Sequence, residues 1–316
     1  MPEWVVSFPE RLDAFLGSEG RMQSRAKAQR AIAEGRVLVN DDIALKPARR
    51  LQEGDVVQLA EAPQETLSAI VPVDLRLVVL YEDRRCLVLQ KPAGVAVHPG
   101  AGIAPREITL LTGVAFLFQE RGLPFSAHAV LAHRLDKDTT GCLLVAKDPE
   151  AHAFLQRQFE ERTVRKVYLA LVAGIPSPAA AQIDAPIGRH SLERTRMTVL
   201  GAVGERPAQT IYRTVATSPV VDAALLACEL HTGRTHQIRV HLSTIGHPVL
   251  GDSTYTSTLS ERLTGDFAIR SACLHAWKLR FNSPADQQEH EIEAPLPSAF
   301  HSVLTSMEIS ALLSHT

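Results

Sequence analysis

The sequence contains few of the features that mark secreted, membrane-spanning or zinc-bound proteins. Only four cysteines occur in 316 residues, and because they are scattered without a Cys-x-x-Cys pair, neither a disulfide framework nor a zinc knuckle is expected. No apolar run approaches the roughly 18 residues of a membrane span, and the first residues lack the basic and apolar regions of a secretion signal. These absences predict a soluble cytoplasmic protein without a membrane partner.

An excess of positive charge is also missing. The chain has 33 Lys and Arg against 35 Asp and Glu, which gives a formal net charge of -2. This balance excludes a uniformly basic nucleic-acid coat but leaves room for a local basic patch. Hydrophobic residues make up 45% of the 316 residues, enough for a buried core, and the length suggests about two domains at roughly 150 residues each.

Residues 1–62 are predicted to form a small domain of two helices followed by strands. Apolar residues recur at helical spacing over residues 12–16, Ser24 suits the N-cap of a second helix, and Gly35 suits its end. The remaining expected elements are strands at residues 37–39 and 55–59 and a turn at residues 40–42.

A local excess of positive charge lies in this small domain. Residues 10 to 50 include nine Lys or Arg and six Asp or Glu. Because a helix N-terminus already favours anions, cations there are unfavourable unless an anion is bound. Binding of an RNA backbone and a merely solvated basic helix face are both compatible with this pattern. The cations concerned are Arg21, Arg25, Lys27 and Arg30.

The rest of the chain predicts a linker at 63–74, a larger domain at 75–300 and a C-terminal tail at 301–316. The larger domain is expected to contain a hairpin at 77–90, a strand at 141–147, a helix from Asp148 and Pro149 to about 161, and a strand at 164–172. Helices and strands alternate without a regular βαβ rhythm. The expected fold class is therefore α+β, with a mixed, mainly antiparallel central sheet and flanking helices.

Three segments contain polar residues that are candidates for binding or catalysis. In residues 91–100, Lys91 and His98 lie in a loop rich in Pro and Gly, and they either face a ligand or decorate a rigid turn. In residues 133–141, six of nine residues are charged or carry a hydroxyl just before an apolar strand. A carboxylate such as Asp136 at that position is a candidate nucleophile, and an adjacent guanidinium would keep it ionised.

The third segment, residues 233–246, fits a helix better than a strand. Ile238, Leu242 and Ile245 fall on one helical face, with Thr235 expected as the cap at the start and Gly246 at the end. On such a helix His236 and Arg239 project together. Zinc binding by the nearby histidines is a weaker alternative. They are five residues apart, and on a helix this spacing places successive side chains about 140° apart around the axis. The three histidines concerned are His231, His236 and His241.

These segments resemble two known families. The helix at 11–16, the Ser24-Arg25 start and the segment 34–40 resemble the S4 RNA-binding domain. The run from His133 to Gly141 resembles the signature of the RluA-type pseudouridine synthases, although Thr140 stands where that family usually has Ser. Four further blocks follow the family's order: Lys91–Gly94, Lys166–Tyr168, Gly233–Arg239 and Gly246–Asp252.

The resemblance implies an isomerase that converts uridine in RNA to pseudouridine after flipping the base out of the stack, with neither a cofactor nor a metal. It implies that Asp136 initiates glycosidic cleavage, by attack on the sugar, attack on the ring or abstraction of a sugar proton. It further implies that Arg239 is the counter-charge of Asp136, and that Tyr168 is a catalytic residue that stacks on the uracil and assists removal of the ring proton. The substrate-binding residues expected around them are His133, Arg134, Arg234, His236 and Leu274.

Several alternatives remain open at this point. The RNA is expected to be large-subunit ribosomal RNA, with transfer RNA as the alternative. A catalytically silent RNA-binding assembly factor and a metal-dependent hydrolase are rival classes. A monomer is expected, because no apolar stripe of the sequence is left without an assigned place.

Overall fold

The computed structural model describes residues 2–18, 20–22, 24–60, 70–98, 107–193 and 195–309, without the side chains of Ala26 and Arg30. The chain divides into two compact units, residues 1–69 and 70–316. Most of the expected linker and the last seven residues of the expected tail lie outside the described residues. Within the described residues, no helix is long and apolar enough to cross a membrane.

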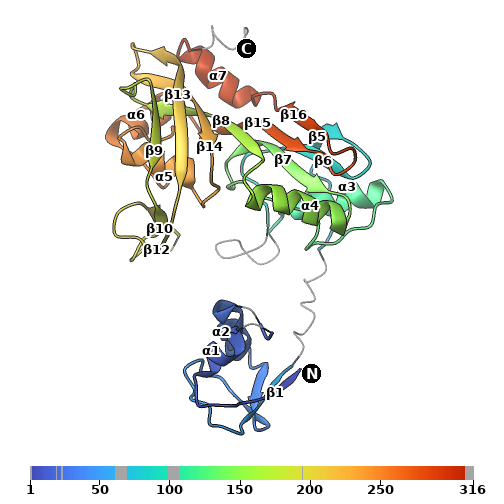
Figure 1. Cartoon of the computed structure of the whole chain (residues 1–316). Coiled ribbons are helices and arrows are strands. Elements are labelled where there is room, and N and C mark those ends of the chain that lie inside the picture. Colours follow the sequence, from blue (N-terminus) through green and yellow to red (C-terminus); the bar gives the residue numbers. More distant parts are fainter. Residues whose placement is uncertain are drawn as a thin grey trace. The chain divides into compact units, whose positions relative to one another are not determined.

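The N-terminal unit consists of two helices packed on a small antiparallel sheet of strand order β1-β4-β2-β3 (Figure 1). The expected helices and strands are present. Ser24 accepts a 3.4 Å hydrogen bond from the backbone N–H of Lys27, and Gly35 follows the second helix with a φ of +70°. The elements are β1 (Glu3–Val5), α1 (Leu12–Gly17), α2 (Arg25–Ala33), β2 (Val37–Val39), β3 (Asp42–Ile43) and β4 (Val56–Leu59).

Two features of this unit differ from the sequence-based expectation. The turn is confined to Asn40 and Asp41, both with positive φ, while Asp42 already belongs to β3. Strand β1 was not expected, because three residues at the start of the chain are too short to show an alternating pattern. Its partner β4, more than 50 residues away, specifies it by backbone pairing from Glu3 to Val5.

The second unit is built on a nine-stranded sheet of order β5-β6-β7-β15-β8-β14-β13-β9, with β16 paired to β15. Its strand pairs are antiparallel except for β7 and β15, which run parallel, so the α+β class with a mixed, mainly antiparallel sheet is confirmed. The sheet strands are β5 (Val78–Glu82), β6 (Cys86–Lys91), β7 (Thr140–Ala146), β8 (Arg165–Ala173), β9 (Ala180–Asp184), β13 (Gln209–Ser218), β14 (Ala223–Leu230), β15 (Leu274–Asn282) and β16 (Glu289–Glu293).

Within its described residues, a smaller sheet and five helices complete this unit. The small sheet has the order β11-β10-β12. These elements are α3 (Leu110–Glu120), α4 (Pro149–Glu160), β10 (Ile187–Arg189), β11 (Met197–Thr198), β12 (Val203–Arg206), α5 (Gln237–Thr244), α6 (Thr258–Asp266) and α7 (Ser298–Ser306). Asp148 caps α4 as expected, since its side chain accepts a 2.8 Å hydrogen bond from the N–H of Ala151.

Successive side chains of the central strands point to opposite faces of the sheet, and a layer of hydrophobic core lies on each face. On β8, Tyr168 and Ala170 face a cluster that also contains residues of α3 and α5. Leu169 and Leu171 face the opposite side and pack with α6 and α7, while α4 covers the β6–β7 end of that side. The period of two along an extended strand dictates this division. The first layer is the one that holds the candidate site.

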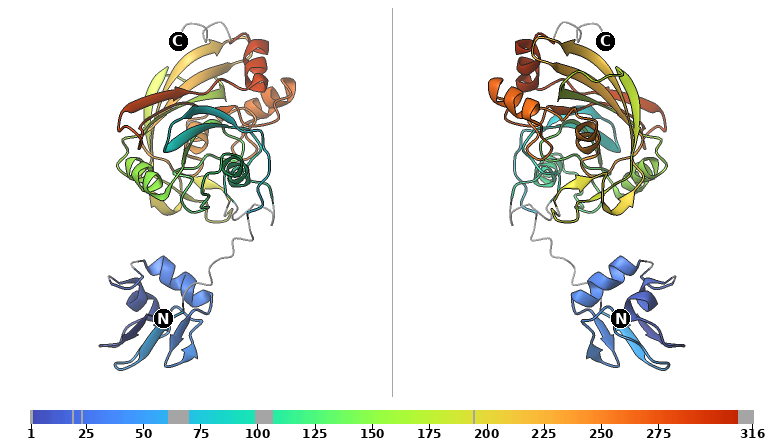
Figure 2. Two further views of the ribbon diagram at one scale, coloured as in Figure 1. Left: turned by 90° about the vertical axis from the view of Figure 1, so that its right-hand side faces the viewer. Right: turned by 90° about the vertical axis from the view of Figure 1, so that its left-hand side faces the viewer.

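Helix α7 crosses the boundary expected at residue 300. It begins at Ser298 and buries Phe300 and Leu304 beside α6 (Figure 2). Met307 and Ile309 are also buried. Residues 301–309 therefore belong to the core of the second unit rather than to a tail, because their apolar side chains cover strands that would otherwise be exposed.

Candidate active site

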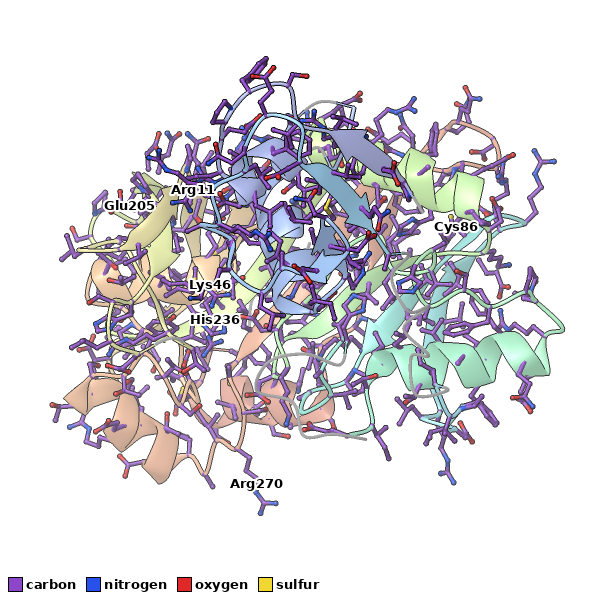
Figure 3. The ribbon with its side chains drawn as sticks, turned by 90° about the horizontal axis from the view of Figure 1, so that it is seen from below. Arg11, Lys46, Cys86, Glu205, His236 and Arg270 are labelled. Carbon is purple, nitrogen blue, oxygen red and sulfur yellow. The ribbon has the colours of Figure 1, made fainter. Side chains whose placement is uncertain are left out.

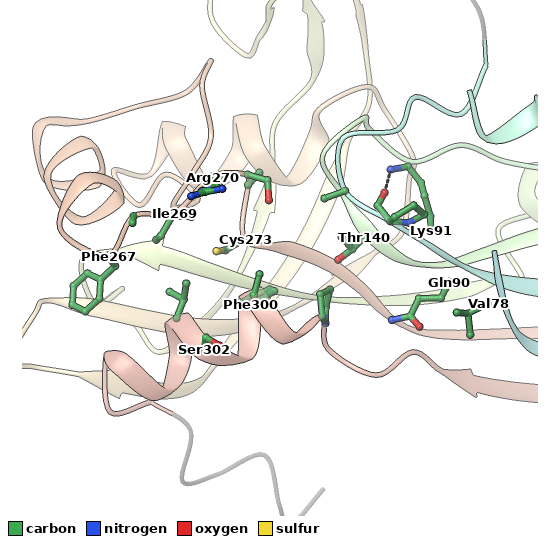
Figure 4. Close-up of a pocket in the computed structure, with 18 of the residues that line it drawn as sticks. Val78, Gln90, Lys91, Thr140, Phe267, Ile269, Arg270, Cys273, Phe300 and Ser302 are labelled. Atoms are coloured by element: carbon green, nitrogen blue, oxygen red, sulfur yellow. Dashed lines mark hydrogen bonds between the residues drawn. The ribbon is translucent and has the colours of Figure 1, made fainter. Parts of the chain in front are cut away.

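A buried lysine supports the loop that carries Asp136. Lys91 ends β6 (Figure 4). Its Nζ donates hydrogen bonds to the carbonyl oxygens of Pro92 at 2.7 Å, Lys137 at 2.7 Å and Thr139 at 2.9 Å. Burial lowers the pKa of this ammonium to about 8. Of the two possibilities left open by the sequence, the structure supports the rigid turn, because the Lys91 ammonium holds the backbone on both sides of residue 138.

The carboxylate of Asp136 lies against the guanidinium of Arg239. Oδ2 of Asp136 is 3.3 Å from Nη1 of Arg239, and the Asp136 side chain is 20% exposed. Arg239 comes from α5, 103 positions further along the chain. The charge pair inferred from the family resemblance is therefore present in the folded chain.

A second carboxylate, which the sequence analysis did not single out as a site residue, holds Arg239 in place. Asp252 is fully buried and accepts from Nε of Arg239 at 2.5 Å and from Nη2 at 2.8 Å. It also accepts from the backbone N–H of Thr254 at 2.8 Å and of Tyr255 at 3.1 Å. Burial opposes the charge of Arg239, but its bonds with Asp252 and Asp136 raise its pKa overall. The only sequence signal for Asp252 was its place in a family-like block.

Tyr168 and Leu274 form the apolar wall of the same site. They lie on the neighbouring strands β8 and β15, where Leu274 pairs with Ala170, and both belong to the inner cluster of the sheet. Burial and the nearby charge of Asp136 raise the pKa of Tyr168, so its phenol is neutral at physiological pH. A cavity of about 100 Å³ brings these two residues together with Asp136 and Arg239.

The start of α5 differs from the expectation that Thr235 caps it. The N-cap is His236, whose φ of 57° is left-handed and whose side chain makes no capping bond. Gln237 instead organises this turn: its Oε1 accepts from Thr232 Oγ1 at 2.7 Å and from the N–H of Arg234 at 3.0 Å. His236 is therefore not on the helix itself, although it still lines the cavity.

His236 and Arg239 nevertheless meet at a common neighbour. Nδ1 of His236 is 3.0 Å from the hydroxyl of Tyr255, and the Arg239 guanidinium lies 5.2 Å from the centre of the Tyr255 ring. Burial lowers the pKa of His236, with Asp136 acting in the opposite direction. His241, by contrast, is buried against Thr210 and the carbonyl of Ala185. Two of the three histidines considered for zinc, His236 and His241, thus have other partners.

Of the remaining expected substrate-binding residues, two line the cavity and one does not. Arg134 and Arg234 line the cavity; the former is exposed, and Nε of the latter donates to the carbonyl of Pro207 at 3.1 Å. His133 does not line it. Its ring stacks on Phe159 at 4.6 Å and its Nε2 accepts from the N–H of Leu144 at 2.9 Å. Burial lowers the pKa of His133 to about 3, so it is a neutral structural group.

Two of the four basic residues expected to bind RNA, Arg21 and Arg25, have partners within the N-terminal unit. Nη1 of Arg21 donates to the carbonyl of Phe15 at 2.8 Å, and Nε of Arg25 lies 3.0 Å from the buried carboxylate of Asp13. Asp13 is thus an anion that accounts for one cation at the start of α2 without RNA. Lys27 is exposed, and the side chain of Arg30 lies outside the described residues.

A larger cavity of about 670 Å³ lies on the other side of β7 and β15 (Figure 4). It is bounded by α7 and the segment before β15, and it contains none of Asp136, Tyr168 and Arg239. Arg270 at its rim points into solvent (Figure 3). Size alone therefore does not identify the reactive site: the smaller cavity contains the charged groups.

Sequence comparison identifies the class to which this fold and site belong. The profile of the RNA pseudouridylate synthase family matches residues 85–244, and that of the S4 domain matches residues 10–57. The chain belongs to the RNA pseudouridylate synthase family, whose members isomerise uridine in RNA to pseudouridine, and it carries an S4 domain ahead of the catalytic unit.

Individual relatives cover nearly the whole chain. A ribosomal large subunit pseudouridine synthase D of Nitrosomonas europaea is 39% identical over 94% of this chain and 84% of its own. An uncharacterized RNA pseudouridine synthase of Aquifex aeolicus is 36% identical over 95% of this chain and 94% of its own. Among solved structures, human RNA Pseudouridylate Synthase Domain Containing 1 superposes with a TM-score of 0.57 at 31% identity, covering 70% of this chain and 84% of that one.

Proposed function

We propose that this protein converts uridines of large-subunit ribosomal RNA to pseudouridine, with Asp136 as the initiating group. The proposal rests chiefly on one observation: the Asp136 carboxylate lies 3.3 Å from the guanidinium of Arg239 in a cavity walled by Tyr168 and Leu274. The relatives named for large-subunit RNA support this choice of substrate. A transfer RNA is the alternative substrate.

The reaction breaks the bond between C1′ of the ribose and N1 of uracil, and forms a bond between C1′ and C5. The C5 proton is lost and N1 gains a proton, so no electrons or groups enter from outside. Each of the three possible first steps requires an ionised Asp136 in a partly desolvated cavity. Arg239 supplies the counter-charge that makes this state favourable, and Asp252 keeps the guanidinium aimed at the site.

Tyr168 is proposed to stack on the flipped uracil. Its raised pKa keeps the phenol neutral, and a neutral phenol is a poor base, so stacking is the role that this environment supports best. Arg134, exposed at the mouth of the cavity, is proposed to contact the RNA around the extruded base. Arg234, His236 and Leu274 are proposed to line the pocket. The structural contacts of His133 favour a supporting role beneath the loop.

The proposal is tested by tritium release from large-subunit RNA labelled at C5 of uridine. Asp136→Asn is expected to bind the RNA and release no tritium, because the amide cannot act as the initiating anion. Asp138→Asn, which changes the same group two residues away and outside the cavity, is the matched control and is expected to release tritium at near the wild-type rate. Turnover by Asp136→Asn close to wild type would remove Asp136 from the mechanism.

Mapping of pseudouridine in cellular RNA with and without the gene identifies the substrate. Loss of sites in large-subunit RNA supports the proposal, whereas loss in transfer RNA supports the alternative. Loss of no site would favour a catalytically silent assembly factor.

The proposed cellular site is the cytoplasm, and the proposed functional unit is a monomer. The cytoplasmic assignment is supported by four cysteines that are all free and buried, as expected where thiols stay reduced. The monomer is supported by the origin of the site residues, because a single chain supplies Asp136, Tyr168 and Arg239 to one cavity. Sedimentation equilibrium of the active enzyme tests the oligomeric state.

A further inference from the structure

A second groove adjoins the candidate uridine cavity. It has a volume of about 340 Å³ and lies between the C-terminal end of α4, the start of β8 and the segment after β14. The groove and the cavity share Arg134, Tyr168, Leu230 and Arg234 as walls. A polymer whose base enters the cavity therefore has its backbone beside the groove.

Cations dominate the walls of this groove. They are Arg134, Arg162, Lys166 and Arg234, against the single carboxylate of Glu160. No salt bridge found within the described part of the chain includes any of these five residues. Four cations around one groove repel one another, and an anion bound among them would relieve that repulsion.

Lys166 is the most informative of the four. It is half-buried, its Nζ lies 5.7 Å from the centre of the Phe159 ring, and burial together with the charge of Arg162 lowers its pKa. A partly desolvated ammonium without a carboxylate is unusual in a structural role. It stands two residues before Tyr168, so the same face of β8 presents a cation to the groove and an aromatic ring to the cavity.

Arg162 occupies a position that usually carries glycine. It follows the last turn of α4 with a φ of 60°, and the N–H groups of Arg162 and Thr163 donate to the carbonyls of Phe159 and Gln158, as in a Schellman ending. A helix C-terminus favours a cation, which accounts for a charge at this end. It does not account for Lys166 and Arg234 converging on the same groove.

We propose that this groove binds the phosphate groups next to the target uridine, with Lys166 and Arg162 as binding residues and Arg234 between groove and cavity. The inference rests on the proposed function, since it takes RNA as the ligand. Phosphate is the chemistry that fits, because arginine forks and a lysine point charge are the usual partners of phosphate oxygens. The groove thereby sets where the backbone lies when the base is in the cavity.

The first test is the salt dependence of RNA affinity. Lys166→Gln and Arg162→Gln are each expected to raise the Kd for substrate RNA and to reduce the slope of log K against log salt by roughly 0.7 to 1. Arg165→Gln is the matched control, because this exposed arginine is the neighbour of Lys166 and does not line the groove. Slopes that fall equally in all three variants, or in none, would overturn the proposal.

The second test locates the phosphate. A set of short substrate RNAs carries one neutral methylphosphonate each, at successive positions flanking the target uridine. Wild-type enzyme is expected to lose affinity at one or two of these positions, and the double variant of Lys166 and Arg162 is expected to show no further loss there. If the loss from each methylphosphonate and the loss from the double variant add at every position, the groove assignment is overturned. Additivity would mean that neither Lys166 nor Arg162 contacts any of these phosphates.

Failure of this inference is distinguishable from failure of the proposed function. Tritium release by the wild-type enzyme is measured on the unmodified RNA of the same set. If wild type releases tritium and the losses are additive, only the groove is wrongly assigned. If wild type releases none from ribosomal RNA fragments but does so from transfer RNA fragments, the substrate is corrected and the groove is tested on the latter.

Discussion

The interaction of Asp252 with Arg239 leads to a prediction in which stability and activity fall together. Asp252→Asn removes the charge of a fully buried carboxylate that makes two bonds to the guanidinium. The asparagine can still accept from the backbone N–H groups of Thr254 and Tyr255, but its NH₂ must face a donor of Arg239. Breaking one side of a buried ion pair typically destabilises a protein by about 3–5 kcal/mol. For a unit of this size, that corresponds to a decrease in Tm of about 6–20 °C.

The same substitution is expected to slow turnover roughly 100-fold, because a misplacement of about 1 Å in a positioned group has effects of that order. Asp136→Asn provides the contrast. Its side chain is partly exposed and its bond to Arg239 is longer, 3.3 Å, so its effect on stability is expected to be no more than about 1 kcal/mol. It is expected to remove activity but to leave the fold nearly unchanged.

Calorimetric unfolding and tritium release, measured on the same preparations, test this pair of outcomes. Asp266→Asn, an exposed carboxylate at the end of α6, is the control for loss of one negative charge and is expected to change stability by less than about 0.5 kcal/mol. The reasoning is refuted if Asp252→Asn unfolds at the wild-type temperature, or if it is destabilised while turnover at a permissive temperature is unchanged.

Three further predictions follow from the site and the domain division. Tyr168→Leu is expected to weaken RNA binding by about 1–3 kcal/mol through loss of a stacking face, whereas Tyr168→Phe keeps the affinity; equal losses in a filter-binding assay would assign the effect to the hydroxyl. Because burial lowers the pKa of Lys91 to about 8 from 10.5, the folded protein binds fewer protons than the unfolded chain between these values. The contribution of Lys91 to stability therefore rises with pH in that window, while turnover falls because the neutral amine has two N–H groups for three carbonyls. The free energy of unfolding is measured against pH for wild type and for Lys91→Met, and the difference between the two isolates the contribution of Lys91. A difference that does not change with pH would contradict the prediction. Removal of residues 1–69 is expected to lower RNA affinity and its salt dependence more than turnover at saturating RNA; unchanged affinity at several salt concentrations would argue against RNA binding by the S4 unit.

Local signals in the sequence determined much of the secondary structure. Asp148 and Pro149 start α4 because a cap and a fixed φ act within one turn. The hairpin of β5 and β6 was expected for a similar reason, since its two strands are close in the chain. The family-like blocks also predicted Asp136, Tyr168 and Arg239 as neighbours, which the structure brings to one cavity.

Only the tertiary structure decided how these parts complete one another. Asp136 and Arg239 are 103 residues apart, and β7 pairs in parallel with β15 through residues 135 positions away, so no local pattern encodes either contact. The same holds for the bonds of Asp252 to the guanidinium and for the bonds of Lys91 to three backbone carbonyls around the loop that carries Asp136. Charge, capping and periodicity act over a few residues and can therefore be predicted from the sequence. Burial and the identity of a buried group's partner depend on which distant segments the sheet brings together.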